Sequence, residues 1–493
     1  MTPEKMALSH RILLIACCAL LLSGWLAPQA VALAEMQTRP HRTETFLYQV
    51  QSGDTLEAVA ARFRVRPQDI ACPITVMPRQ LLPAGLILAI PVNADSLPPA
   101  AHLLPDSEVI FSPSAADFDP QAFVAAAGGY LNTYREYLRS TSWTSGAEIV
   151  TRIALENSIN PRLLLALLEY SCGCVSGDLR PGMNPNYLMG LQDPIRKGLY
   201  RQLGWAVNQL SLGFYGWRAG LITELSFHDG AFIRLSPAQN AGSVALAFLF
   251  SQSLSQVAWQ EALDPFSGFS SLYSRMFGNP WARARQVEPL FPPVLLQPEL
   301  HLPFVTRQIW SYTSGPHNAW ETDGALAALD FAPESLVEGC VASEAWITAV
   351  AAGQVVRSEH GAVVLDLDGD GLEQTGWAIL YMHVEAHDRA PVGTKLKAGD
   401  RIGHPSCEGG PASGTHLHIA RKYNGEWIAA DGPLPFVMDG WTAHAGYRPY
   451  EGTLTHGDRT IVANIFTPAE ALIWQTYWDA HKILPETRLP RKD

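Results

Sequence analysis

The chain has 493 residues, of which 47% are hydrophobic and 17% charged. Such a length predicts about three domains, and the composition excludes a wholly disordered protein. The net charge is −12 and no long run of Lys or Arg occurs, which excludes nucleic-acid binding as the main function.

The N-terminus has the pattern of an export signal. Residues 1–34 combine a positively charged start, an apolar run from Ile12 to Leu22 and the small-residue sequence Ala32-Leu33-Ala34. This pattern is typical of a secretory signal peptide. The apolar run is short for a membrane span, and an uncleaved N-terminal anchor is the alternative. We therefore expect the protein to be secreted or associated with the cell envelope, outside the cytoplasmic membrane.

Residues 46–92 form the first predicted module. The sequence "YQVQSGDTL", starting at Tyr48, predicts a strand that leads through a Gly-Asp turn into a capped helix, and an apolar strand ending at Pro91 closes the segment. The segment resembles a LysM module, a small βααβ fold. The resemblance implies binding of glycans that contain N-acetylglucosamine. The alternative is a spacer of the same β-α-α-β order without ligand binding.

A helical region is predicted next. Residues 93–118 are rich in Pro, Ser and Ala and predict a linker, whereas 119–290 keep apolar residues at helical spacing. Glu169 ends an apolar helix just before a Ser-Cys-Gly turn. This resembles the lysozyme-like fold of lytic transglycosylases and glucosaminidases, where a Glu at this place is the general acid. Glu169 is thus a candidate catalytic residue, and a helical scaffold domain is the alternative.

The last third of the chain has a different pattern. Residues 291–303 predict a second linker, and 304–440 show short alternating strands with Gly-rich turns. Residues 441–493 predict a mixed tail with a helical end around Ala469 to His481. The whole chain is therefore predicted to be a multidomain α+β protein.

Candidate ligands and bases lie in this β-rich region. His416 and His418, in "GTHLHIA", are two residues apart and would point to the same face of a strand. His383 ends an apolar strand, His317 lies in a loop, and Asp330 lies in a strand-like run. Two imidazoles that share one site suit a metal ion with an adjacent general base.

Several ordered motifs resemble the lysostaphin-type zinc metallopeptidases, which cut peptide cross-bridges in bacterial cell walls. The motifs are "LDFAP", "WITAVAAGQVV", "YMHV", "VGTKLKAGDRIGH" and "SGTHLHIA". The resemblance implies that His317, Asp330 and His418 bind Zn²⁺. It also implies that His383 and His416 are the catalytic pair.

The spacing of the first two ligands departs from that family. The family usually places its first His and Asp four residues apart, but Asp330 lies thirteen residues after His317. Glu321, at the usual distance, is the alternative ligand. The sequence "DFAP" after an apolar strand favours Asp330, and the extra residues would form a loop over the site.

The cysteines outside the signal are Cys72, Cys172, Cys174, Cys340 and Cys407. Disulfides persist in exported proteins, so at least one is expected. A bridge from Cys340 to Cys407 would tether the active-site loop, and two free buried thiols are the alternative. Cys172 and Cys174 are too close in sequence for an ordinary bridge and are predicted not to bond to each other.

The sequence therefore predicts a secreted peptidoglycan hydrolase. Its zinc endopeptidase domain would cut peptide cross-links, and its LysM module would hold the enzyme on wall glycan. A wall-binding activator without catalysis is one alternative, although such proteins tend to lose ligand histidines. A glycan-strand hydrolase that acts through the helical domain is another. The bond cut and the oligomeric state stay open.

Overall fold

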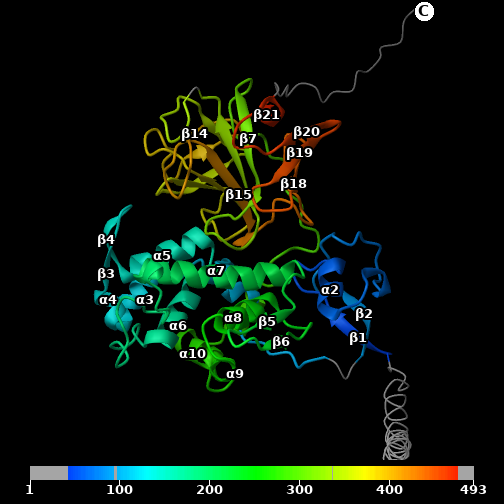
Figure 1. Ribbon diagram of the computed structural model, residues 1–493, viewed down its shortest axis with the longest axis vertical. Coiled ribbons are helices and arrows are strands. Elements are labelled where there is room, and N and C mark those ends of the chain that lie inside the picture. The colour runs from blue at the N-terminus through cyan, green and yellow to red at the C-terminus, as the bar shows by residue number, and fades with distance from the viewer. Residues whose placement is uncertain (1–42, 94–96, 336, 476–493) are drawn as a thin grey trace, which may run out of the picture. The chain divides into compact units, whose positions relative to one another are not determined.

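The computed structural model describes residues 43–93, 97–335 and 337–475 (Figure 1). The predicted signal peptide and the end of the predicted tail lie outside these residues. Within them, no helix is both long and apolar enough to cross a membrane.

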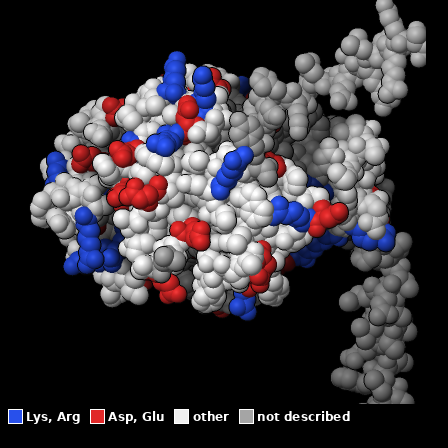
Figure 2. Space-filling model, turned by 90° about the horizontal axis from the view of Figure 1, so that it is seen from above, with Lys and Arg blue, Asp and Glu red and all other residues white. Residues whose placement is uncertain are grey.

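The chain forms two compact units. The first contains residues 1–46 and 91–97, of which few are described, and the second contains 47–90 and 98–493. Charged side chains of both signs are interspersed over the face of the molecule that Figure 2 shows.

The predicted LysM segment contains two paired strands and a helix. Its elements are β1 (Thr43–Gln49), α2 (Leu56–Phe63), the 3-10 turn η1 (Pro67–Asp69) and β2 (Ile87–Asn93). Thr55 caps α2, because its Oγ accepts a hydrogen bond from the Ala58 amide. The second predicted helix is only the single turn η1, since Pro73 and Pro78 follow it and cannot donate helical hydrogen bonds.

The middle of the chain is mainly helical, as predicted. The helices are α3 (Pro120–Ala127), α4 (Tyr130–Thr133), α5 (Gly146–Asn157), α6 (Pro161–Cys172), α7 (Leu199–Arg218), α8 (Ala241–Ser251), α9 (Gln256–Ala262), α10 (Phe269–Phe277) and α11 (Pro280–Val287). Two hairpins, β3 (Arg135–Leu138) with β4 (Ser142–Ser145) and β5 (Glu224–Ser226) with β6 (Phe232–Arg234), lie between them. The Leu-rich helix α6 is buried along most of its length in the core of this region.

The predicted linker at 93–118 differs from the structure. Residues 103–115 include two 3-10 turns, η3 (Asp106–Glu108) and η4 (Pro113–Ala115), and pack into the helical core. Leu104 and Val109 are fully buried there. The prolines of this stretch form the turns of a packed segment, which composition alone does not distinguish from a linker.

The last third is built from antiparallel strands. These are β7 (Ile309–His317), β8 (Ala328–Pro333), β9 (Ile347–Thr348), β10 (Gly353–Glu359), β11 (Ala362–Asp366), β12 (Trp377–Met382), β13 (Lys395–Leu396), β14 (Arg401–Gly403), β15 (Leu417–Tyr423), β16 (Glu426–Trp427), β17 (Val437–Met438), β18 (Trp441–Ala445), β19 (Gly452–His456), β20 (Arg459–Val462) and β21 (Leu472–Trp474). The main sheet has the order β13-β10-β11-β12-β15-β8-β7-β21, with β16 beside β15. A second sheet has the order β17-β18-β19-β20.

The described part of the predicted tail belongs to this β structure. Strands β18 to β20 follow residue 440, and β21 pairs with β7 at the edge of the main sheet. The predicted terminal helix is a 3-10 turn at η6 (Ala469–Ala471) followed by β21, and its remainder lies outside the described residues. Ile473 is fully buried against the sheet, and this long-range contact outweighs local helical spacing.

Two disulfides are present among the described residues. Cys340 bonds to Cys407, as predicted. The prediction that Cys172 and Cys174 do not bond to each other was wrong, because they form a disulfide with their Cα atoms 5.1 Å apart. Gly173 between them has φ +67° and ends α6, so the chain reverses there.

Candidate metal centre

Three neighbouring strands place the predicted ligands. His418 on β15 lies directly opposite Asp330 on β8, and β7, which ends at His317, pairs with the other side of β8. Both β8 and β15 are buried, so a carboxylate and an imidazole are fixed inside the sheet. The antiparallel register brings together residues that lie far apart in sequence.

The three ligand atoms converge closely. His317 Nε2 lies 3.0 Å from His418 Nδ1, and Asp330 Oδ1 lies 3.2 Å from each of these nitrogens. All three residues are buried. Among the described residues, they form a group that could hold a metal ion.

The hydrogen bonds around the group fit a cation. His317 Nδ1 lies 2.9 Å from the Gly315 carbonyl oxygen, and His418 Nε2 lies 2.9 Å from that of Ala319. A carbonyl accepts, so these nitrogens carry the protons and the opposite ones face each other with lone pairs. Asp330 Oδ1 is buried without a hydrogen-bond partner. Two neutral nitrogens and one carboxylate are a common ligand set of catalytic zinc, which leaves one position open.

Electrostatics keep the carboxylate ionised. Burial raises the pKa of Asp330, but the charge of His317 and polar contacts with His317 and His418 outweigh it, so its pKa lies well below the ordinary value. Burial lowers the pKa of His317, but the charge of Asp330 outweighs this effect and raises it, so a bound cation would take the place of a proton on His317 Nε2. Burial lowers the pKa of His418, which favours its neutral ring. The ligand set therefore offers a negative oxygen and a neutral imidazole to a cation.

Two further histidines lie beside the group. The rings of His383 and His416 are 4.3 Å apart, and His416 Nε2 lies 3.8 Å from Asp330 Oδ2. Their Nδ1 atoms lie 2.8 Å from the carbonyl oxygens of Glu408 and Gly414 respectively. The Nε2 atoms are therefore left as proton acceptors.

His383 is held in an unusual state. Burial, followed by the charges of His416 and His418, lowers its pKa to about 3, so the ring is neutral at neutral pH. Its φ is +65°, a left-handed conformation that is uncommon outside glycine. Such strain persists where surrounding structure holds it, and it is frequent at functional sites.

The alternative ligand Glu321 is placed elsewhere. Its carboxylate faces Gly204 of α7, and burial followed by the charge of Glu156 raises its pKa. It is not part of the three-residue group. The residues between β7 and β8 form the loop that the longer spacing requires.

Tyr450 is a site residue that the sequence analysis missed. Its ring stacks on the His317 ring with centroids 4.5 Å apart and planes at 22°, and 55% of the residue is exposed. Its amide donates to the Pro316 carbonyl, and its carbonyl accepts from the Gly315 amide. It follows β18, in the segment predicted as a tail, where the sequence pattern gave no signal of a site residue.

Glu169 lies in the helical region, near the C-terminal end of α6. Its carboxylate accepts hydrogen bonds from the amides of Val175 and Ser176 and from the Ser176 hydroxyl. The carboxylate thus ties the helix end to the following loop. Its role as a general acid stays a prediction.

Comparison with known proteins identifies two domain families in the chain and similarity to a protease. The family described as LasA, N-terminal domain, matches residues 102–290, and the LysM domain family matches residues 48–71. The chain is 25% identical over 357 residues to Protease LasA of Pseudomonas aeruginosa, covering 68% of this chain and 77% of that protein.

Solved structures of peptidases also match, at low overall similarity. The M23 metalloprotease Pseudoalterin from the deep sea is 20% identical, with 34% of this chain and 96% of that chain covered and a TM-score of 0.29. The catalytic domain of lysostaphin from Staphylococcus simulans is 23% identical, with 24% and 87% covered and a TM-score of 0.18. The predicted LysM module is confirmed by the family match, and the predicted peptidase agrees with the similarity to Protease LasA. A lysozyme-like fold of the helical region stays a prediction.

Proposed function

We propose that this chain is a zinc endopeptidase that cuts peptide cross-links of bacterial peptidoglycan. The observation that carries the proposal is the convergence of His317, Asp330 and His418, with His383 and His416 directly beside them. The similarity to a protease over most of the chain supports a peptidase. The alternative of a non-catalytic activator is disfavoured because all five side chains are present and close together.

Each residue has a chemical role in this proposal. Zinc, when bound, supplies a Lewis acid that polarises the scissile carbonyl and lowers the pKa of a water molecule. His416 Nε2 accepts the proton of the attacking water, because its Nδ1 is engaged with the Gly414 carbonyl. His383, whose Nδ1 bonds to the Glu408 carbonyl, faces the same site with a neutral ring, so its Nε2 accepts a hydrogen bond and orients the attacking water beside His416.

The LysM module would hold the enzyme at the cell wall. We expect it to bind wall glycans that contain N-acetylglucosamine, while peptide stems enter the metal centre. A weak glycan binder linked to the peptidase raises the local substrate concentration. Export through the predicted signal peptide would place both activities at the cell wall.

Mass spectrometry of muropeptides tests the peptidase. Purified full-length protein should release peptides with new termini from peptidoglycan, a chelator should stop the release, and added zinc should restore it. A non-catalytic activator would release no new termini. A glycan hydrolase acting through Glu169 would release new reducing ends, and these would persist with the chelator.

Sedimentation with insoluble peptidoglycan tests the glycan binding. The full chain carrying His416→Ala should pellet without digesting the wall, and chitin oligomers should displace it. If the chain stays in the supernatant, the LysM segment is a spacer in this protein.

A further inference from the structure

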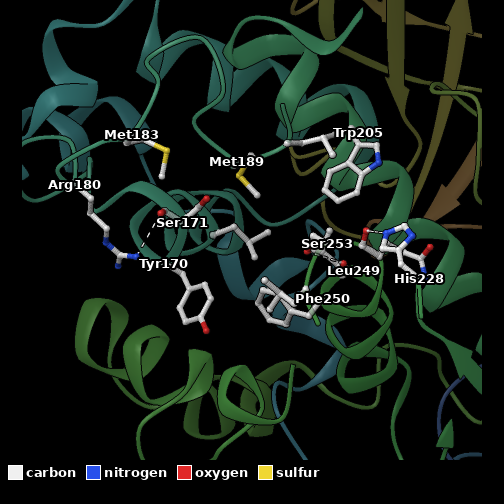
Figure 3. A pocket seen from close by; sticks show the side chains of 15 residues that line it. Tyr170, Ser171, Arg180, Met183, Met189, Trp205, His228, Leu249, Phe250 and Ser253 are labelled. Atoms are coloured by element: carbon white, nitrogen blue, oxygen red, sulfur yellow. Dashed lines mark hydrogen bonds between the residues drawn. The ribbon is translucent and has the colours of Figure 1, made fainter. Parts of the chain in front are cut away.

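The helical region contains a cavity of about 540 Å³, which Figure 3 shows from close by. Its walls come from the end of α6, the loop at 180–191, α7 and the end of α8. The lining residues are Leu167, Tyr170, Ser171, Arg180, Met183, Met189, Gly190, Leu191, Trp205, His228, Leu249, Phe250, Gln252, Ser253 and Leu254. The metal ligands are not among them.

Most of this lining is apolar and part of it is adaptable. Leu249 and Phe250 are nearly fully buried and belong to the helical core. Met183 and Met189 lie on one side of the cavity with their thioethers directed inward (Figure 3). Methionine side chains adjust to irregular apolar ligands, so this wall suits a flexible aliphatic chain.

One permanent charge stands at the edge of the cavity. The Arg180 guanidinium donates to the main-chain oxygens of Ser171 at 3.4 Å and Glu169 at 3.3 Å. Among the described residues, no carboxylate forms an ion pair with it, because the Glu169 carboxylate is engaged by the 175–176 loop. A guanidinium has five N–H donors, so several remain for a ligand.

We propose that this cavity binds an amphipathic monocarboxylate with an unbranched aliphatic chain. The chain lies among the Met and Leu side chains, and the carboxylate pairs with Arg180. Charge complementarity selects an anion, and the apolar lining selects an aliphatic body. Met183, Met189, Leu249 and Phe250 offer no hydrogen-bonding side-chain groups to a sugar, and Nε2 of His228 already bonds to the Gln252 carbonyl.

Calorimetric titration of the full-length protein with dodecanoate tests the proposal. Dodecanoate should bind once per chain, and Arg180→Gln should weaken its binding by about tenfold or more, since charge-assisted bonds are lost. Arg201→Gln is the matched control. Arg201 is exposed and donates to a main-chain carbonyl, that of Ile195, but does not line the cavity, so its variant should bind as the unmodified protein does.

Two further titrations separate the parts of the proposal. Dodecanol should bind equally to the unmodified protein and to Arg180→Gln, because it carries no charge. Met189→Trp should abolish dodecanoate binding by filling the cavity. If that variant does not fold, the comparison of Arg180→Gln with Arg201→Gln, both at exposed positions, is the deciding test. The proposal is overturned if dodecanoate does not bind, or binds Arg180→Gln unchanged. It is also overturned if chitotetraose binds at a site that Met189→Trp removes, which would make the cavity a glycan site.

Discussion

At the scale of single residues, two histidines of the candidate metal centre are oriented by glycine carbonyls close to them in sequence. His317 and His416 each place Nδ1 against the carbonyl of the glycine two residues earlier, Gly315 and Gly414. A side chain at Gly315 would meet the Glu451 carbonyl oxygen at 2.4 Å, so only glycine fits there. This local Gly-x-His arrangement sets which ring nitrogen is free before any long-range contact is made.

Replacing Asp330 tests the metal ligands. Asp330→Asn keeps the shape but removes the only negative charge of the three-residue group. Loss of a residue that only hydrogen-bonds to a metal ligand typically lowers metal affinity by about 10- to 100-fold. Asp330 would contact the metal directly, so we expect a larger loss of zinc affinity, measured by competition with a chelating dye. Asp323→Asn, at an exposed position of the loop between β7 and β8, is the control. Unchanged affinity in Asp330→Asn would remove this residue from the site.

Replacing His416 tests the general base. His416→Ala should retain zinc, because the three ligands are intact, but lose about 100- to 10,000-fold in turnover on muropeptides. His387→Ala is the matched control, because its side chain is 80% exposed and outside the site. Wall digestion at the normal rate by His416→Ala would assign proton transfer to another group, with His383 the first to be tested.

At the scale of elements, the sequence patterns predicted the strands that carry the candidate metal ligands, but not Tyr450, which packs against one of them. In "GTHLHIA" the two histidines are separated by a leucine, and "LDFAP" is mostly apolar. These patterns predict the buried strands β15 and β8, which bring His418 opposite Asp330. Tyr450 was missed because its place depends on main-chain bonds to Gly315 and Pro316, over a hundred residues away. Periodicity carries no information about such long-range bonds, nor about the pairing of β21 with β7.

The disulfide between Cys340 and Cys407 fixes two loops at the site. It joins residues 67 apart in sequence, and Glu408, next to Cys407, holds the His383 ring. Replacing both cysteines with serine should lower the free energy of unfolding by about 2–4 kcal/mol, through the larger entropy of the unfolded chain. Urea denaturation measures the change.

The control for the disulfide is Cys72→Ser, since Cys72 has no disulfide partner. We also expect the double variant to digest peptidoglycan more slowly, because the loop that orients His383 is less restrained. Equal stability and equal activity of the double variant and the control would show that this bond has no structural role.

At the scale of the molecule, the helical region and the β-rich region share a buried ionic group. Arg218 at the end of α7 lies 2.9 Å from Asp106 of η3 and 3.2 Å from Glu426 of β16. All three are buried. One guanidinium between two carboxylates leaves an excess of negative charge, and Glu288 adds to it. Burying such a group is costly unless a proton is taken up.

Glu426 is the carboxyl on which this excess acts. Burial raises its pKa to about 7, although the charge of Arg218 opposes the shift. The folded protein therefore holds a proton on Glu426 that the unfolded chain releases near its ordinary pKa of 4.5. A raised carboxyl pKa contributes stability that is complete below the unfolded value and is lost as pH rises through the folded value. The free energy of unfolding should then fall with pH between these values, by at most about 1.4 kcal/mol per pH unit.

Glu426→Gln removes this titration while keeping the size of the side chain. Its urea transition should depend less on pH between 5 and 7 than that of the unmodified protein, because the amide neither gains nor loses a proton. Glu338→Gln, at an exposed position, is the control and should keep the full dependence. The comparison between the two variants cancels the contributions of all other titratable groups, because both variants contain them. If both variants follow the same pH profile, Glu426 is ionised in the folded protein throughout, and Arg218 alone offsets the charges of Asp106 and Glu426.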